Sequence, residues 1–307
     1  MKAKYTNFII CSLILLFLIE IFDHTNLIIT IFYESSKLWF YKLLPTLFPF
    51  FIITDLLSNY GFIQYISKIL GKFMKIFKLN ETSSYAFFMS IISGFPGNSK
   101  LIKELLDNNE IKKEEANKLL TFTHFSNPLF LIGTVGIIFL NNKKIALLIL
   151  IIHYLTNIIV GLMFRNIYHI NNKSNEIQKK KQLSFINILI KSINNTIKTM
   201  FLIYGIIIFT SLLTNIITIN LNLSPFINAI LTGLLEMTQG LQLVANLPLN
   251  LPIKVSLMTF FISFGGISIH IQIMGILSEY QINYYIYFLA RIIHASIASL
   301  IIYCLLL

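Results

Sequence analysis

One short apolar stretch, at residues 83–96, ends in the sequence SGFPGNSK (residues 93–100). Pro96 has no backbone N–H with which to continue a helix, and Gly97 tolerates positive φ. A helix is therefore expected to stop at this point. The segment predicts two short helices joined by a break, rather than one continuous membrane-spanning helix.

The residues after the break favour a second helix. Asn98 and Ser99 are good N-caps for a helix that begins near Lys100. A helix N-terminus inside a hairpin presents free N–H groups and a partial positive charge, which suit an anionic or polar ligand. The alternative is a plain turn between a membrane span and a surface helix.

The composition places this break in a membrane protein. Hydrophobic residues make up 56% of the 307-residue chain and charged residues only 12%, with a net charge of +11. Soluble domains carry about 25% charged residues, so a soluble enzyme, a disordered chain and a disulfide scaffold are excluded. Nine apolar stretches approach spanning length: 7–22, 43–58, 83–96, 119–140, 144–168, 196–218, 226–246, 253–277 and 283–306.

The lysines predict the topology. They gather in residues 1–6, 60–80, 98–118 and 165–198, between the apolar stretches, as cytoplasmic loops do under the positive-inside rule. If every stretch crossed the membrane, 60–80 and 165–198 would face opposite sides. A re-entrant hairpin over 83–107 places all four segments in the cytoplasm, with the first apolar stretch as an uncleaved span.

Short similarities between the two parts of the chain predict an internal repeat. Ser93-Gly94 matches Thr232-Gly233, and Ile151-Ile152-His153 matches Ile292-Ile293-His294, at offsets of 139 and 141 positions. Three crossings in each half would invert one half relative to the other, an arrangement common in secondary transporters. The predicted fold is all-α: a polytopic transmembrane helical protein of two inverted repeats with broken or re-entrant helices. The predicted segments are 1–40 (N-terminal helix and linker), 41–170 (repeat 1), 171–195 (basic cytoplasmic loop) and 196–307 (repeat 2).

A second break is predicted within each half. Pro128, in Ser126-Asn127-Pro128, removes a helix hydrogen bond inside an apolar run, where Asn127 can fill the gap or face a cavity. The matching position in the other half is Gly265-Gly266, also a helix breaker. The alternative is a proline kink that serves packing only.

Glu236 is a carboxylate in the middle of an apolar stretch, where it should pair or line a polar cavity. One interpretation is a structural pair with Arg291, and another is a cation or proton site. We expect the first tip (Gly94–Ser99) to meet the second tip (Gly233–Gly240) near the membrane midplane. The residues predicted to line a solute or ion site are Gly94, Pro96, Gly97, Asn98, Ser99, Ser126, Asn127, Pro128, Glu236, Thr238, Gln239, Gly265 and Gly266.

The histidines His124, His153, His270 and His294 lie within or beside apolar stretches. Hydrogen-bonded packing is the default interpretation, with a proton relay as the alternative. No metal site is expected, because partner ligands at metal-binding spacing are missing. Since no catalytic or nucleotide-binding motif is present, we expect no enzyme and no cofactor. No nucleic-acid partner is expected either, because the lysines lie in short runs between apolar segments and leave no room for a folded polar domain.

The chain resembles the YlbJ-type family of sporulation integral membrane proteins, whose gate domain is described as a nucleoside-recognition domain. The matching segments, which together cover about residues 40–300, are LPTLFPFF (44–51), SGFPGNSK (93–100), EEA (114–116), FSNPLF (125–130), GTV (133–135) and GLLEMTQG (233–240). The resemblance implies a multi-pass protein of the cell (inner) membrane of an endospore-forming bacterium, with a role in spore cortex formation. It does not identify a substrate.

We therefore expect a membrane protein of sporulation that acts as a transporter or gate for an unknown small polar solute. Its expected partners are the lipid bilayer, the solute, and a second copy or other sporulation membrane proteins. The rival hypothesis is a non-transporting scaffold of a spore-envelope complex. In that case the charged helix expected over 99–120 and the basic loop would be the docking surfaces.

Overall fold

The computed structural model describes residues 2–168, 170 and 184–307, and every regular element among them is a helix. The α-helices are α1 (Lys2–Asp23), α2 (Thr25–Leu38), α3 (Leu44–Asn59), α4 (Phe62–Met74), α5 (Ser83–Ser93), α6 (Gly97–Asp107), α7 (Lys113–Leu120), α8 (Lys143–Met163), α9 (Phe185–Asn220), α10 (Pro225–Leu235), α11 (Met237–Asn246), α12 (Leu251–Phe264), α13 (Gly266–Ile276) and α14 (Tyr284–Leu306). The π-helical segments are η1 (Trp39–Leu43) and η3 (Phe130–Phe139), and the 3-10 turns are η2 (Lys75–Phe77) and η4 (Ser278–Tyr280).

The predicted all-helical, multi-pass architecture is confirmed. Within lipid, backbone polar groups must bond inside their own segment, which favours helices for stretches rich in Ile, Leu and Phe. Five segments are long and apolar enough to cross a membrane: Tyr5–Asp23, Lys143–Met163, Phe185–Asn220, Leu251–Ile276 and Tyr284–Leu306. Four shorter apolar helices account for the remaining predicted stretches: Leu47–Asn59, Ser83–Ser93, Phe130–Phe139 and Pro225–Leu235.

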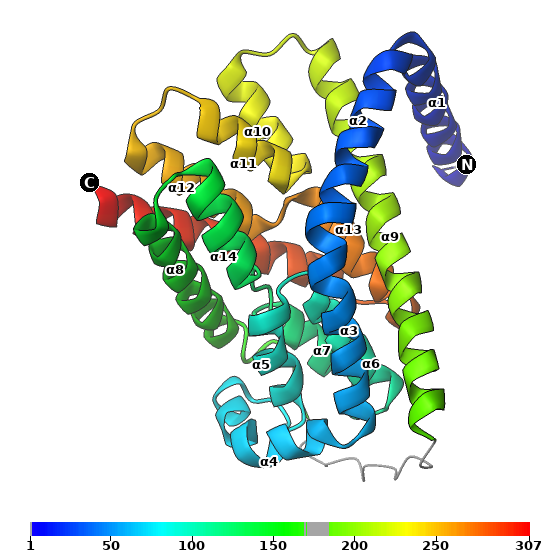
Figure 1. Cartoon of the computed structure of the whole chain (residues 1–307), viewed down its shortest axis with the longest axis vertical. Helices are drawn as coiled ribbons and strands as arrows, with labels where there is room; N and C mark the ends of the chain where they lie inside the picture. Colours follow the sequence, from blue (N-terminus) through cyan, green and yellow to red (C-terminus); the bar gives the residue numbers. More distant parts are fainter. Residues whose placement is uncertain (1, 169, 171–183) are drawn as a thin grey trace.

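Two groups of helices make up the body of the molecule. In Figure 1, α2 and α3 run alongside the long helix α9, and each of them contacts α9. On the other side, α14 packs against both α12 and α8. The segments α5–α6, α10–α11 and α12–α13 are broken at Gly94, Glu236 and Gly265, and these residues are buried, so the breaks fall in the interior.

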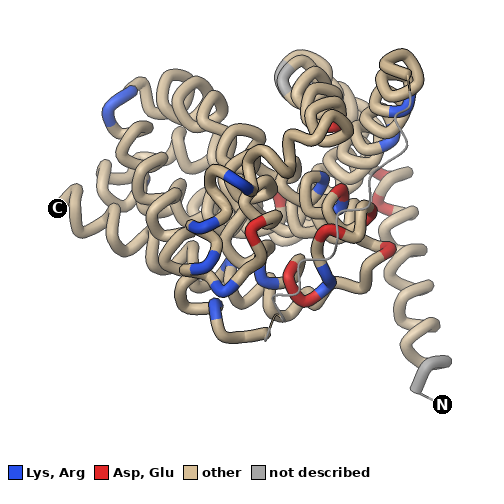
Figure 2. The backbone as a smooth tube through the Cα atoms, turned by 90° about the horizontal axis from the view of Figure 1, so that it is seen from below, with Lys and Arg blue, Asp and Glu red and all other residues tan. Residues whose placement is uncertain are grey.

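Charged residues gather at the end of the molecule that carries the short helices α4, α6 and α7 (Figure 2). Lys118 joins three segments there, because its ammonium donates to the carbonyls of Lys78 (3.1 Å), Arg165 (2.9 Å) and Tyr168 (3.0 Å). The predicted re-entrant topology requires these lysine-bearing segments to share one side. Which side faces the cytoplasm stays a prediction.

The helix expected over 99–120 is divided into α6 and α7, and some of its charged residues, such as Glu115 and Lys118, are buried. Glu115 is buried and accepts hydrogen bonds from the backbone N–H of Asn80 and the hydroxyl of Ser83. Burial raises the pKa of this carboxyl, although these hydrogen bonds oppose the shift. The charges that remain exposed there include Lys112, Lys113 and Glu114.

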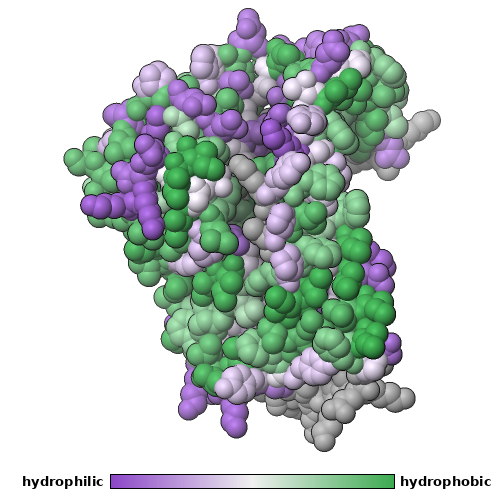
Figure 3. Space-filling view, in the orientation of Figure 1, coloured by the Kyte–Doolittle hydropathy of each residue, from purple (hydrophilic) through white to green (hydrophobic). Residues whose placement is uncertain are grey.

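Hydrophobic side chains cover much of the face shown in Figure 3, with hydrophilic residues towards its two ends. Helix α1 stands apart from the body in Figure 1, and none of its apolar window is buried. A surface this apolar requires lipid or other membrane helices as its surroundings.

The order of elements recurs along the chain. A broken pair (α5–α6), a second interrupted segment (α7–η3) and a long helix (α8) are followed later by α10–α11, α12–α13 and α14. The inverted relation between the halves stays a prediction. Of the predicted basic loop, residues 171–183 lie outside the described residues, and α9 begins at Phe185, within the segment assigned to that loop.

Candidate functional site

The first tip is broken where the sequence predicts it. Helix α5 ends at Ser93, Gly94 has φ 69°, and α6 begins at Gly97. A Cβ on Gly94 would lie 2.5 Å from the backbone nitrogen of Asn127. Glycine is thus required both by the positive φ and by the close approach of the Ser126–Pro128 break.

The predicted capping of the following helix is wrong. Helix α6 begins before Asn98 and Ser99, with Pro96 at the N-cap position and no side-chain cap. Ser99 Oγ instead donates to the carbonyl of Pro96 at 2.6 Å, and Asn98 Nδ2 lies 3.5 Å from Thr123 Oγ1. Both residues are buried within the first turn, so they pack the tip rather than start the helix.

The Ser126–Pro128 break holds the first tip. Asn127 Nδ2 lies 3.3 Å from the carbonyl oxygens of both Ile92 and Ser93, and its Oδ1 accepts the N–H of Leu129 at 2.8 Å. The same amide therefore satisfies the end of α5 and the start of the next helical segment. This is the gap-filling role that the sequence predicts for Asn127.

The second tip breaks at Glu236, between α10 and α11. The Glu236 carboxylate caps α11, because its Oε2 accepts the N–H of Gln239 at 2.7 Å. The arms of this hairpin pack closely: a Cβ on Gly240 would lie 2.1 Å from the Cα of Gly233.

The Gly265–Gly266 break lies against the second tip and against the first half. Both glycines have positive φ, 90° and 68°. A Cβ on Gly266 would lie 2.9 Å from Met237 N, and one on Gly265 would lie 2.7 Å from His124 Nε2. The breaks predicted in the two halves therefore meet in the interior of the protein.

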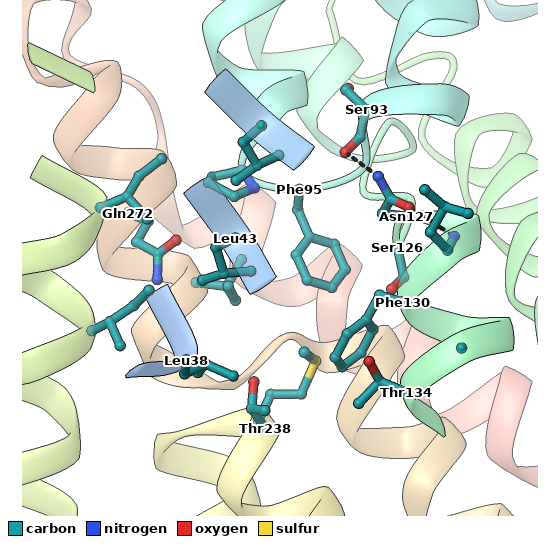
Figure 4. A pocket seen from close by; sticks show the side chains of 18 of the residues that line it. Leu38, Leu43, Ser93, Phe95, Ser126, Asn127, Phe130, Thr134, Thr238 and Gln272 are labelled. Carbon is teal, nitrogen blue, oxygen red and sulfur yellow. Dashed lines mark hydrogen bonds between the residues drawn. The ribbon is translucent and has the colours of Figure 1, made fainter. Parts of the chain in front are cut away.

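A cavity of about 540 Å³ lies where these breaks meet; we call it the central cavity (Figure 4). Its wall includes Pro96, Ser126 and Asn127 from the first half and Glu236 and Thr238 from the second. The other predicted residues do not line it: Gly94, Gly97, Asn98, Ser99, Pro128, Gln239, Gly265 and Gly266. Three of these residues, Gly94, Gly265 and Gly266, instead allow close packing behind the wall: a Cβ at each would lie within 3 Å of a neighbouring segment.

Sequence reasoning missed part of the wall. Gln272 on α13 is 1% exposed and its amide points into the cavity in Figure 4, while Thr134 lies on η3 at the opposite wall. An amide within the apolar stretch 253–277 is the same signal that singles out Asn127. Ile203 and Ile207 of α9 also contribute, and no local pattern distinguishes them from lipid-facing residues.

The suggested Glu236–Arg291 pair does not form among the described residues. The buried Arg291 guanidinium donates to the Thr121 carbonyl, to Asn157 Oδ1 at 3.3 Å, and bonds His294 Nδ1 at 2.9 Å. These contacts hold the cation against Thr121, Asn157 and His294 instead of at the second tip.

The histidines form hydrogen bonds among the helices. His153 Nε2 accepts the N–H of Ser126 at 3.0 Å, its Nδ1 lies 2.9 Å from Ser263 Oγ, and its carbonyl lies 2.9 Å from His294 Nε2. No group of three or more potential metal ligands occurs among the described residues. This network fits the packing interpretation, and the proton relay stays a prediction.

A buried ion pair that sequence reasoning did not single out lies next to the first tip. The Lys100 ammonium donates to the Phe51 carbonyl at 3.0 Å and to Thr196 Oγ1 at 3.3 Å, and lies 3.6 Å from Asp55 Oδ1. Lys100 therefore links α6 to α3 and to α9. The signal available was Asp55, a carboxylate inside the apolar stretch 43–58.

Comparisons with known proteins show what the chain is similar to. Residues 40–165 match the family described as Gate, nucleoside recognition. The chain is 28% identical over 340 aligned positions to the sporulation integral membrane protein YlbJ of Bacillus subtilis (strain 168), covering 97% of this chain and 82% of that protein. No solved structure matches the chain. The predicted resemblance to the YlbJ-type sporulation membrane proteins with a Gate domain is confirmed, and it fits a membrane role in sporulation.

Proposed function

We propose that this protein acts in endospore formation, at the stage of the spore cortex, by binding a small polar solute in the central cavity and passing it across the cell membrane. The N-terminus is assigned to the cytoplasm. The proposal involves binding and movement without a chemical step. The observation that carries it is the meeting of polar residues from separate breaks at one cavity of about 540 Å³.

Broken helices suit this task for a physical reason. Irregular backbone at membrane depth is tolerated where it is buried in protein or lines a cavity, and it leaves helix ends and polar side chains facing that space. Asn127 and Glu236 meet this description, since each satisfies a helix end and also lines the cavity. The cavity volume is within the range typical of small-molecule sites, roughly 300–1,000 Å³.

The test is complementation of a deletion strain in a spore former, with heat-resistant spores as the measurement. Glu236→Gln and Asn127→Ala should each reduce the spore count at normal protein level, because both change the cavity wall. Glu114→Gln serves as the matched control, since it removes an exposed carboxylate away from the cavity. Full complementation by both cavity variants would refute a functional cavity.

The scaffold hypothesis is a second candidate, favoured by helix α1, whose apolar window has no buried residue. Such a helix has its surface available for other membrane proteins. Here charge reversal at the exposed residues Lys112 and Lys113 should abolish sporulation, whereas the cavity variants should complement. The two candidates therefore predict opposite results from the same set of strains.

A further inference from the structure

Helix α4 is turned across the end of α3 by a glycine. Helix α3 ends at Asn59, and Gly61, with φ 86°, adopts the left-handed conformation that residues with a side chain rarely tolerate. The chain changes direction there, and in Figure 1 α4 runs across the end of α3. Helix α4 therefore lies at the lysine-bearing end of the molecule instead of continuing the path of α3.

One face of α4 is fixed to the body of the protein. Its buried residues recur every three or four positions: Ile63, Ser67, Gly71 and Met74. A Cβ on Gly71 would lie only 2.5 Å from Glu81 Cβ, so the helix packs closely against the segment that leads to α5. The opposite, outer face of α4 is thus held in a fixed orientation.

The outer face of α4 carries an exposed apolar stripe. Tyr65 is 62% exposed and Ile69 is 55% exposed, and because they are four positions apart they are neighbours on the helix surface. Ile76, 48% exposed in the following turn η2, extends the stripe seven positions beyond Ile69. An apolar helix face of this kind is disfavoured in water and is stabilised at the boundary between lipid headgroups and acyl chains.

Two lysines border this stripe. Lys68 and Lys72 are exposed, and each stands three positions after a residue of the stripe, so each lies beside it on the helix. Neither forms an ion pair with a carboxylate of the described residues. The sequence from 56 to 80 contains no aspartate or glutamate. The outer face of α4 therefore joins an apolar stripe to a positively charged edge.

We propose that α4 lies along the surface of the bilayer and binds the headgroup of an anionic phospholipid through Lys68 and Lys72, with Tyr65 and Ile69 against its acyl chains. Charge complementarity decides the partner, because paired lysines beside an apolar stripe match a negative headgroup above apolar chains. A zwitterionic headgroup has no net charge for these lysines to neutralise. This lipid site goes beyond the proposed function, since it does not involve the central cavity.

The test places a fluorescent reporter on the stripe. In a Cys11→Ser/Cys304→Ser background, which removes both native cysteines, the thiol of Ile69→Cys is labelled with the uncharged fluorophore bimane. The full-length protein is reconstituted into phosphatidylcholine vesicles that contain nitroxide-labelled phosphatidylglycerol or, in the matched sample, nitroxide-labelled phosphatidylcholine. An acyl-chain nitroxide quenches bimane only at short range, so the quenching reports which lipid lies against α4.

Both labelled lipids should quench the reporter, and at equal mole fraction the quenching constant for phosphatidylglycerol should be higher by about five-fold or more. Lys68→Gln/Lys72→Gln should bring the ratio of the two constants close to one. The matched control, Lys143→Gln/Lys144→Gln, removes two exposed lysines at the start of α8 and should leave the ratio unchanged. Added salt should lower the ratio, because the lysines are exposed.

Three results would overturn the proposal. Equal quenching by the two lipids, with both lysines present, would show a bilayer contact without selection of the headgroup. A preference that survives Lys68→Gln/Lys72→Gln would place the anionic lipid at another site. Absence of quenching by either lipid would show that the stripe faces water or protein. For this last result, a reporter at Leu155→Cys, 53% exposed on the span-length helix α8, must be quenched in the same vesicles.

Discussion

The first and second tips both interrupt a helix, but they do so with different residue types. Each interrupts a helix in the interior, yet the first uses Gly94 and Pro96 with no side-chain cap, whereas the second uses the Glu236 carboxylate as its cap. The charged residue of the first tip region, Lys100, is turned towards Asp55, Phe51 and Thr196. Equivalent breaks in the two halves therefore differ in what they offer the cavity: closely packed backbone on one side and a carboxylate on the other.

The largest expected effect on stability is at Lys100, whose charge is part of a buried ion pair, in contrast to Glu236 on the cavity wall. Lys100→Met leaves the buried Asp55 carboxylate without its cation, and breaking a buried pair in this way costs about 3–5 kcal/mol of unfolding free energy. Denaturant unfolding of the detergent-purified protein measures the loss. Lys103→Met, at a more exposed position on the same helix, is the control, and an equally small effect from both would contradict the assigned role of Lys100.

Gly94→Ala tests the backbone of the first tip. Its φ of 69° and the 2.5 Å approach of an added Cβ to Asn127 N leave no room for a methyl group. The free energy of unfolding should therefore fall by about 1–3 kcal/mol. Gly205→Ala on α9, where a Cβ meets nothing within 4 Å, should instead leave stability equal or higher. Melting temperatures of the two variants suffice, and equal values would argue against a closely packed first tip.

Glu236→Gln should cost little stability, because the glutamine oxygen can still accept the N–H of Gln239. Losing an N-cap side chain entirely costs typically about 1 kcal/mol, which sets an upper limit for this conservative change. The same unfolding assay checks it, with Glu236→Ala as the more disruptive partner variant. A loss as large as that of Lys100→Met would show that Glu236 is mainly structural and would remove the contrast between the tips.

The smallest effect concerns an exposed contact between the halves, where Lys103 Nζ lies 2.6 Å from Glu279 Oε2. This hydrogen bond and the lysine charge lower the pKa of the Glu279 carboxyl below its ordinary value of 4.5. Its stabilising contribution is thus complete above pH 4.5 and is lost as the pH falls through the lowered pKa. Glu279→Gln should be slightly less stable than wild type at pH 7 and equal to it in acid; a constant difference across this range would exclude the linkage.

Much of the fold could be predicted from the sequence, because its signals are local. The nine apolar stretches, the breaks at Pro96, Pro128 and Gly265-Gly266, and the isolated Glu236 follow from residue types that lipid and helix geometry constrain directly. The capping of α6 could not be predicted in the same way, since Asn98 and Ser99 suit an N-cap yet lie buried in the first turn.

The sequence by itself determined that this is an all-helical membrane protein with helices broken at named positions, since composition and breaker residues act within one segment. Only the tertiary structure decided which polar groups share a space. It directs Lys100 to Asp55 and Arg291 to Thr121, leaves Glu236 on the cavity wall, and brings Gln272 opposite Thr134. The physical reason is that pairing and burial depend on contacts between residues far apart in the chain, such as Lys100 of α6 with Thr196 of α9, or α11 with η3, which no local pattern encodes.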